Sequence, residues 1–122
     1  MIEIIHFDKP NVIGFRLDGK IDDDGYDRAI AKIQQALDNN DKISIYAEVE
    51  KFGGLSIEKF FENFKVKFGF LKELDKFEKE AIVSDKQWLE TMIKLSDKLF
   101  PSVEVRYFSF ENKADALAWV KS

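Results

Sequence analysis

The sequence predicts an α/β fold with a five-stranded mixed sheet that is mostly parallel, an antiparallel N-terminal edge strand and four helices. Strand-like and helix-like periodicities alternate along the chain, an order typical of right-handed βαβ units. The turn-forming run 8–11 separates the first two strand-like segments, which indicates an antiparallel hairpin. A length of 122 residues with 45% hydrophobic composition suits one core, so residues 1–122 are predicted to form one domain.

Two strands and a helix are expected in the first forty residues. Residues 2–7 are apolar and β-branched, and residues 12–18 alternate in polarity. Apolar residues then recur at helical spacing at Tyr26, Ile30, Ile33 and Leu37. The acidic run 22–25 is expected to cap this helix. As a calcium loop of the EF-hand type it would place Ala31 where a bidentate Glu is needed, so calcium is not expected.

Three further strands and three further helices are expected in the rest of the chain. The strands are predicted at residues 43–49, 81–83 and 103–107. The helices are predicted after the candidate N-cap residues Ser56, Ser84-Asp85 and Asn112, and Pro101 ends the second of them. The order of elements is therefore β-β-α-β-α-β-α-β-α.

Composition excludes several classes of function. The net charge of −4 disfavours nucleic-acid binding, and the absence of Cys excludes disulfides, thiolate metal sites and a Cys nucleophile. No cofactor or metal is expected. The single histidine, His6, is predicted to be partly exposed and non-catalytic near the end of an edge strand. The N-terminus lacks signal-peptide features and no apolar run approaches about 20 residues. We therefore expect a cytoplasmic protein without a transmembrane segment.

Three stretches carry a resemblance to a known family: LDGKI at 17–21, KEAIVSDKQWL at 79–89 and ALAWV at 116–120. With them, the chain resembles the SpoIIAA-like proteins, relatives of STAS domains (anti-sigma-factor antagonists) that are linked to lipid-binding SEC14-type domains. The resemblance implies a STAS-like fold over nearly the whole chain and no settled activity. Phosphorylatable STAS domains carry an Asp-Ser pair after a central strand, and the matching residues 51–55 lack it. Ser56 is therefore expected to be a structural cap rather than a phosphosite.

The chain is rich in phenylalanine, with 12 Phe residues, and the segment from Ile57 to Leu71 places several of them at helical spacing. This pattern is typical of a core helix, but it extends beyond what one sheet contact needs. A hypothetical cleft is predicted to be lined by Phe60, Phe64, Phe68, Trp88 and Met92. Polar or anionic groups are predicted to contact helix N-termini at Gly53, Gly54, Ser56, Ser84 and Asp85.

Two functions remain open at this point. The first is a non-enzymatic STAS/SEC14-like module that binds a small apolar or amphipathic ligand in the aromatic cleft. The alternative is a protein–protein interaction regulator, or a homodimer without a ligand, that uses the same aromatic surface. A hydrolase built on Glu48, Glu50 and Asp85 is the least favoured, because a chain with 23 acidic residues brings carboxylates together by chance.

Overall fold

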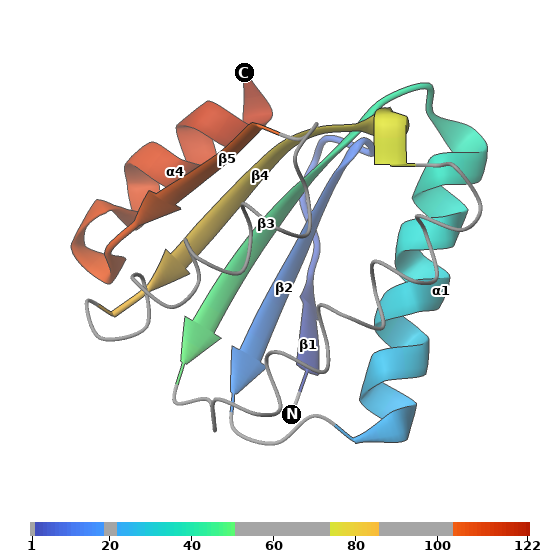
Figure 1. The fold of residues 1–122 in the computed structure, drawn as a ribbon, viewed down its shortest axis with the longest axis horizontal. Helices are drawn as coiled ribbons and strands as arrows, with labels where there is room; N and C mark the ends of the chain where they lie inside the picture. Colours follow the sequence, from blue (N-terminus) through green and yellow to red (C-terminus); the bar gives the residue numbers. More distant parts are fainter. Residues whose placement is uncertain (1, 19–21, 51–73, 86–103) are drawn as a thin grey trace.

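The computed structural model describes residues 2–18, 22–50, 74–85 and 104–122 and has a five-stranded sheet at its centre (Figure 1). The strands lie in the order of the chain: β1 (Ile2–Ile5), β2 (Val12–Asp18), β3 (Ile43–Glu50), β4 (Phe77–Ser84) and β5 (Glu104–Phe108). β1 pairs antiparallel with β2, and all other neighbours are parallel. The predicted mixed sheet with an antiparallel N-terminal edge strand is confirmed.

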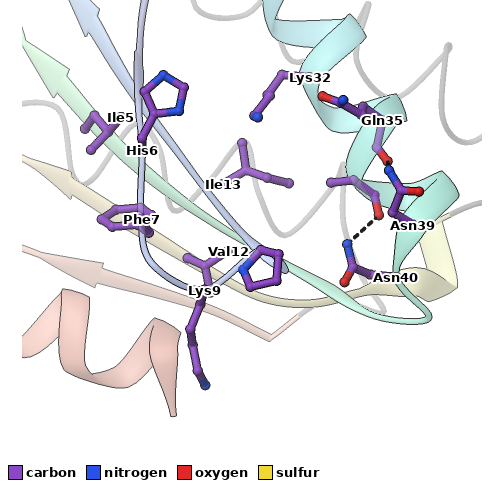
Figure 2. A pocket seen from close by; sticks show the side chains of 12 residues that line it. Ile5, His6, Phe7, Lys9, Val12, Ile13, Lys32, Gln35, Asn39 and Asn40 are labelled. Atoms are coloured by element: carbon purple, nitrogen blue, oxygen red, sulfur yellow. Dashed lines mark hydrogen bonds between the residues drawn. The ribbon is translucent and has the colours of Figure 1, made fainter.

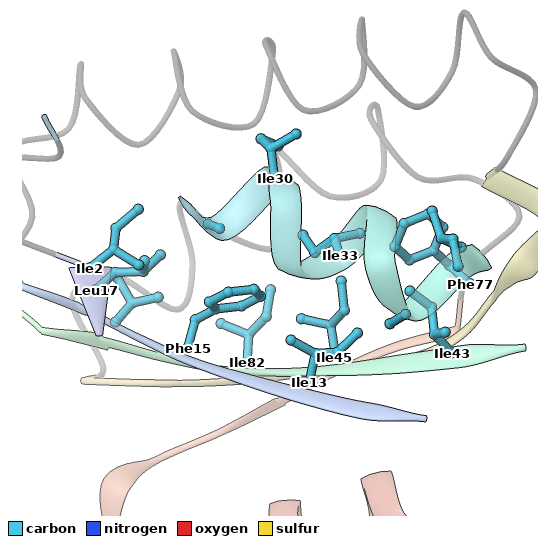
Figure 3. Packing of buried hydrophobic residues seen from close by; sticks show 14 residues of the cluster. Ile2, Ile13, Phe15, Leu17, Ile30, Ile33, Ile43, Ile45, Phe77 and Ile82 are labelled. Carbon is cyan, nitrogen blue, oxygen red and sulfur yellow. The ribbon is translucent and has the colours of Figure 1, made fainter. Parts of the chain in front are cut away.

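Two α-helices lie within the described residues, α1 (Asp23–Asn39) and α4 (Lys113–Lys121). They lie on opposite faces of the sheet (Figures 1 and 3), which we call the α1 face and the α4 face. Short 3-10 helices precede β4 at Leu74–Lys76 and α4 at Phe110–Asn112. The sequence predicted four helices; the helix expected after Ser56 and the one expected between residue 85 and Pro101 lie outside the described residues.

The acidic run before α1 caps the helix, as predicted. The Asp22 carboxylate accepts a hydrogen bond of 2.7 Å from the Gly25 backbone N–H, and Asp23 and Asp24 occupy the first turn. This bond satisfies one of the N–H groups that a helix start leaves without a partner. α1 contributes Ile33, Leu37 and other apolar residues to the buried cluster of the α1 face, whereas Ile30 lies on the side of the helix away from the sheet (Figure 3).

Strand alternation divides the core between the two faces. On the α1 face, Ile13, Phe15 and Leu17 of β2 pack with residues of α1 and β3. On the α4 face, Val12 and Tyr46 belong to a second buried cluster with residues of β4 and α4. Because side chains alternate along each strand, the face of every residue in the sheet follows from its register.

β4 is longer than the sequence indicated, because the prediction at 81–83 left out the charged residues that precede it. The strand begins at Phe77, and its register against β3 shifts between Ile43 and Ser44, which is typical of a bulge. Past this shift, Lys79 lies on the α4 face and Glu80 on the α1 face. The shift and the charges conceal the first half of this strand, residues 77–80, from a search for alternating apolar residues.

Two smaller differences concern the ends of elements. β1 ends at Ile5 rather than Phe7, and the chain then enters the turn toward β2. Asn112 occupies the N-cap position of α4, but its side chain makes no cap hydrogen bond; it donates instead to the Ser109 hydroxyl at 3.2 Å. The prediction that α4 begins after Asn112 is therefore confirmed, but the predicted capping hydrogen bond of the Asn112 side chain is not formed.

Candidate functional site

Two glutamates are buried in the middle of the sheet, on neighbouring strands and on opposite faces. Glu48 of β3 is 3% exposed and Glu80 of β4 is 7% exposed. Glu48 pairs with Arg16 in the row of the α4 face, whereas Glu80 pairs with Ile45 in the row of the α1 face. A buried carboxylate is costly unless hydrogen bonds or opposite charges compensate it. How each glutamate is compensated therefore separates a structural role from a functional one.

Glu48 is fully partnered on the α4 face. Its carboxylate accepts hydrogen bonds from the Tyr46 hydroxyl at 2.8 Å and from Arg16 Nε at 2.9 Å. Lys113 Nζ, at the start of α4, lies 3.3 Å from the same carboxylate. Burial acts to raise the pKa of Glu48, but the hydrogen bonds from Tyr46, Arg16 and Lys113 outweigh it and lower the pKa below its ordinary value. Glu48 is thus ionised, and its carboxylate links β2, β3 and α4.

The same network reaches the edge strand. Arg16 Nη1 lies 3.3 Å from the Glu3 carboxylate, so one guanidinium joins β1 to the buried Glu48. A pocket of about 240 Å³ lies beside it, lined by Glu3, Arg16, Asp18 and Glu50. Glu48 is held by three donors, and Glu50 is exposed at the end of β3. This arrangement fits a structural ion network better than the acid–base pair that the hydrolase alternative needs.

Glu80 has the opposite surroundings. Its cross-strand neighbours are Ile45 on β3 and Val105 on β5, and Ile13 continues the same row. Within the described ranges, no hydrogen bond or ion pair reaches its carboxyl group. Burial raises the pKa of Glu80 from 4.5 to about 7. Buried polar groups without partners are rare in folded proteins, and acids with shifted pKa values gather at functional sites. Glu80 is therefore the candidate functional residue of the α1 face.

Sequence reasoning missed Glu80, although a signal was present. The predicted strand at 81–83 contains Ile82, which is buried on the α1 face. Extending the two-residue alternation back from Ile82 places Glu80 on that same buried face. The run of charges at 78–80 concealed this, because such runs are most often exposed.

Most of the residues predicted to form the cleft lie outside the described residues: Phe60, Phe64, Phe68, Trp88, Met92, Gly53, Gly54 and Ser56. Two predicted polar contacts are described. Ser84 ends β4, is 0% exposed, and its hydroxyl donates a 3.0 Å hydrogen bond to the Val49 carbonyl. Asp85 follows it and is exposed. An anion contact at these two residues stays a prediction. His6 lies just beyond β1 and is exposed, in agreement with its predicted placement.

Two kinds of feature, a metal site and a membrane-spanning helix, are absent from the described part of the chain. No group of three or more His, Asp or Glu residues there is arranged to hold a metal ion. None of the helices in these ranges combines the length and the apolar character that crossing a membrane requires.

Comparison with protein families matches residues 12–121 to a family model described as SpoIIAA-like. The match spans β2 to the last turn of α4 and includes both buried glutamates. Searches of curated proteins and of solved structures found no significant match.

Proposed function

This chain belongs to the SpoIIAA-like family, and we propose that it is a non-enzymatic binding module for a small amphipathic ligand whose polar group meets Glu80. The observation that carries this proposal is the state of Glu80: 7% exposed and without a polar partner among the described residues. Glu48 on the neighbouring strand differs, because its buried carboxylate has three hydrogen-bond or ion-pair partners. The same fold that satisfies one buried carboxylate in full leaves the other available.

The surroundings of Glu80 favour an amphipathic molecule over a polar one. The same face presents Ile45, Val105 and Ile82, and Phe77 is buried in the same cluster. α1 packs mainly against β1 and β2, at the other side of this face. Ligand sites typically combine apolar walls with a few placed polar groups. A carboxyl with a pKa of about 7 exists in both protonation states near neutrality, so it can donate to an ether or carbonyl oxygen and accept from a hydroxyl.

The predicted aromatic cleft completes this proposal. Phe60, Phe64, Phe68, Trp88 and Met92 would supply the apolar walls, and Gly53, Gly54, Ser56, Ser84 and Asp85 remain candidate polar contacts at its rim. A binding role without chemistry fits the described groups: Glu48 is held by three donors, and the single imidazole, His6, is exposed. Catalysis by paired carboxylates needs a second free acid near the first.

A series of ligands with one chain length and different head groups tests the proposal. Thermal unfolding is measured with octanol, octanoate and octylamine for the wild type, Glu80→Leu and Glu78→Gln. Glu78 is exposed on the same strand and serves as the matched control. We expect at least one of the three ligands to raise the Tm of the wild type and of Glu78→Gln, and the rise to disappear in Glu80→Leu. Native mass spectrometry of protein purified from its host should show a retained small molecule.

Two results would count against this function. The first is the absence of both a retained ligand and a thermal shift with any of the three head groups. The second is an equal thermal shift in the wild type and in Glu80→Leu. Sedimentation at several concentrations then examines the alternative, since a concentration-dependent dimer without ligand favours an interaction protein.

A further inference from the structure

A second pocket lies between the β1–β2 turn and the C-terminal half of α1, and its lining residue Ile13 is two strands away from Glu80 in the sheet. It has a volume of about 240 Å³, and twelve residues line it (Figure 2). The strand side contributes Ile5, His6, Phe7, Lys9, Pro10, Val12 and Ile13. The helix side contributes Lys32, Gln35, Ala36, Asn39 and Asn40. All of these residues belong to the described part of the chain.

The charge of this lining differs from that of the whole chain. The protein carries 23 acidic and 19 basic residues, yet no Asp or Glu lines this pocket. Three basic residues do: His6, Lys9 and Lys32. The Lys9 ammonium donates a hydrogen bond to the Lys121 carbonyl at the end of α4. In the described ranges, His6 and Lys32 have no hydrogen bond or ion pair, so a lysine ammonium and an imidazole remain available to a ligand.

The helix side of the pocket is held in place by its own hydrogen bonds. Asn39 Nδ2 donates to the Gln35 carbonyl and Asn40 Nδ2 donates to the Ala36 carbonyl, each at 2.9 Å. The Ala36 carbonyl is among the last four of α1, which a helix end leaves without helical partners, so the bond from Asn40 helps to satisfy the helix end. Figure 2 shows Asn40 beside the helix end and Ile13 between the helix and the strand side. The wall is therefore formed before any ligand arrives, which lowers the cost of binding.

Besides His6 and Lys9, the strand side of the pocket contributes apolar residues. Ile13 is buried on the α1 face of β2, and Pro10 of the β1–β2 turn lies beside it in the lining. At about 240 Å³ the pocket is smaller than the roughly 300–1,000 Å³ of sites for drug-sized molecules. It therefore suits a compact body with a single charged group rather than a long chain. This size distinguishes its ligand from the amphipathic molecule proposed for Glu80.

We infer that this pocket binds a small organic monoanion, a carboxylate on a compact apolar body, with the carboxylate at Lys32 and His6. The ammonium supplies charge and donors, and an imidazole N–H donates in either protonation state of the ring. Ile13 and Pro10 contact the apolar body. The inference does not depend on the proposed role of Glu80, because none of the twelve lining residues is on β4.

An NMR titration of the ¹⁵N-labelled full chain with benzoate tests the inference. Benzyl alcohol keeps the ring and removes the charge, and inorganic phosphate keeps a charge and removes the ring. We expect benzoate to shift the amide signals of residues 5–13 and 32–40, with at least fivefold weaker binding for benzyl alcohol and for phosphate. Lys32→Gln should weaken benzoate binding at least fivefold.

Arg28→Gln is the matched control, because Arg28 is exposed one turn earlier on α1 and its replacement removes the same charge. It should bind benzoate like the wild type, and so should Glu80→Leu. Equal weakening in Arg28→Gln and Lys32→Gln would overturn the inference, since general charge attraction explains that result. Equal or tighter binding of phosphate, or benzoate shifts spread over the whole sheet, would also overturn it. Loss of benzoate binding in Glu80→Leu alone would contradict the separation of the two sites.

Discussion

Gly14 is the residue whose missing side chain shapes one end of the sheet. It pairs with Ile5 on β1 and with Tyr46 on β3. A Cβ atom at this position would lie 2.6 Å from Phe7 Cε2 and 2.8 Å from Ile5 Cβ. The Phe7 ring occupies that space and meets the Tyr46 ring edge-on, with 5.8 Å between ring centroids. Gly14 thus permits an aromatic contact that covers the α4 face beside the edge strand.

Replacing Gly14 with Ala should destabilise the protein by about 1–3 kcal/mol, the usual range for overpacking. The Phe7 ring can move, but Ile5 Cβ is fixed to the backbone of β1. Urea denaturation measures the loss. In the Phe7→Ala background the same replacement should cost less, because part of the obstruction is gone. If Gly14→Ala lowers the free energy of unfolding equally in both backgrounds, the Phe7 ring is not what excludes a side chain at position 14.

At the scale of elements, two lysines join the ends of α4 to the strands of the sheet. Lys79 Nζ of β4 donates to the Ser122 carbonyl at 2.9 Å and to the Ser122 hydroxyl at 2.6 Å, and reaches the Trp119 carbonyl at 3.4 Å. At the other end, Lys113 pairs with the buried Glu48. A helix of nine residues is marginal by itself, so these contacts and its buried Ala116 and Val120 stabilise it.

Replacing Lys79 with Met keeps the aliphatic stem and removes the ammonium, so α4 should loosen at its C-terminal end. We expect a loss of about 1 kcal/mol in the free energy of unfolding. Amide exchange in residues 117–122 should accelerate about tenfold, while exchange in α1 follows the global change only. Lys76→Met, on the 3-10 helix before β4, serves as a control that should leave α4 unchanged. Equal acceleration in α1 and α4 would contradict a local role.

Elements with regular patterns were predictable, and elements with charges in unusual places were not. Val12–Asp18 alternates cleanly, and the strand has those bounds. The helix after the acidic run also follows its periodicity, because one face is apolar and its cap is a local residue. β4 differs, since Glu78, Lys79 and Glu80 point to different surroundings: solvent, the end of α4 and the buried α1 face. Only the tertiary pairing of β4 with β3 and β5 assigns these environments.

The candidate site shows the same division. The sequence singled out Glu48 as one of several carboxylates near strand ends, but two of its three partners, Arg16 of β2 and Lys113 of α4, are far from it along the chain. Glu80 was not singled out at all, because charge alone argues for exposure. The aromatic cleft at Phe60, Phe64, Phe68, Trp88 and Met92 lies outside the described residues and stays a prediction.

For the molecule as a whole, the two buried glutamates couple stability to pH in opposite directions. Glu48 has a lowered pKa, so its contribution to stability is present above 4.5 and is lost as the pH falls further. Glu80 has a pKa raised from 4.5 to about 7. Between these values the folded state binds more protons at Glu80 than the unfolded state does. Stability therefore falls as the pH rises from about 4.5 to about 7, and levels off above that range.

Glu80→Gln should remove this dependence, because the amide is neutral at every pH in the range. A shift of about 2.5 pKa units corresponds to about 3 kcal/mol. The free energy of unfolding of the wild type should therefore fall relative to Glu80→Gln by most of that amount between pH 5 and pH 8. Urea denaturation at four pH values measures it, and starting at pH 5 keeps Glu48 ionised throughout.

The control is Glu78→Gln, an exposed change on the same strand, whose free energy of unfolding should depend on pH as that of the wild type does. Parallel curves for Glu80→Gln and the wild type would mean that the Glu80 carboxyl is compensated in the folded protein, which would also remove the reason to assign it a ligand.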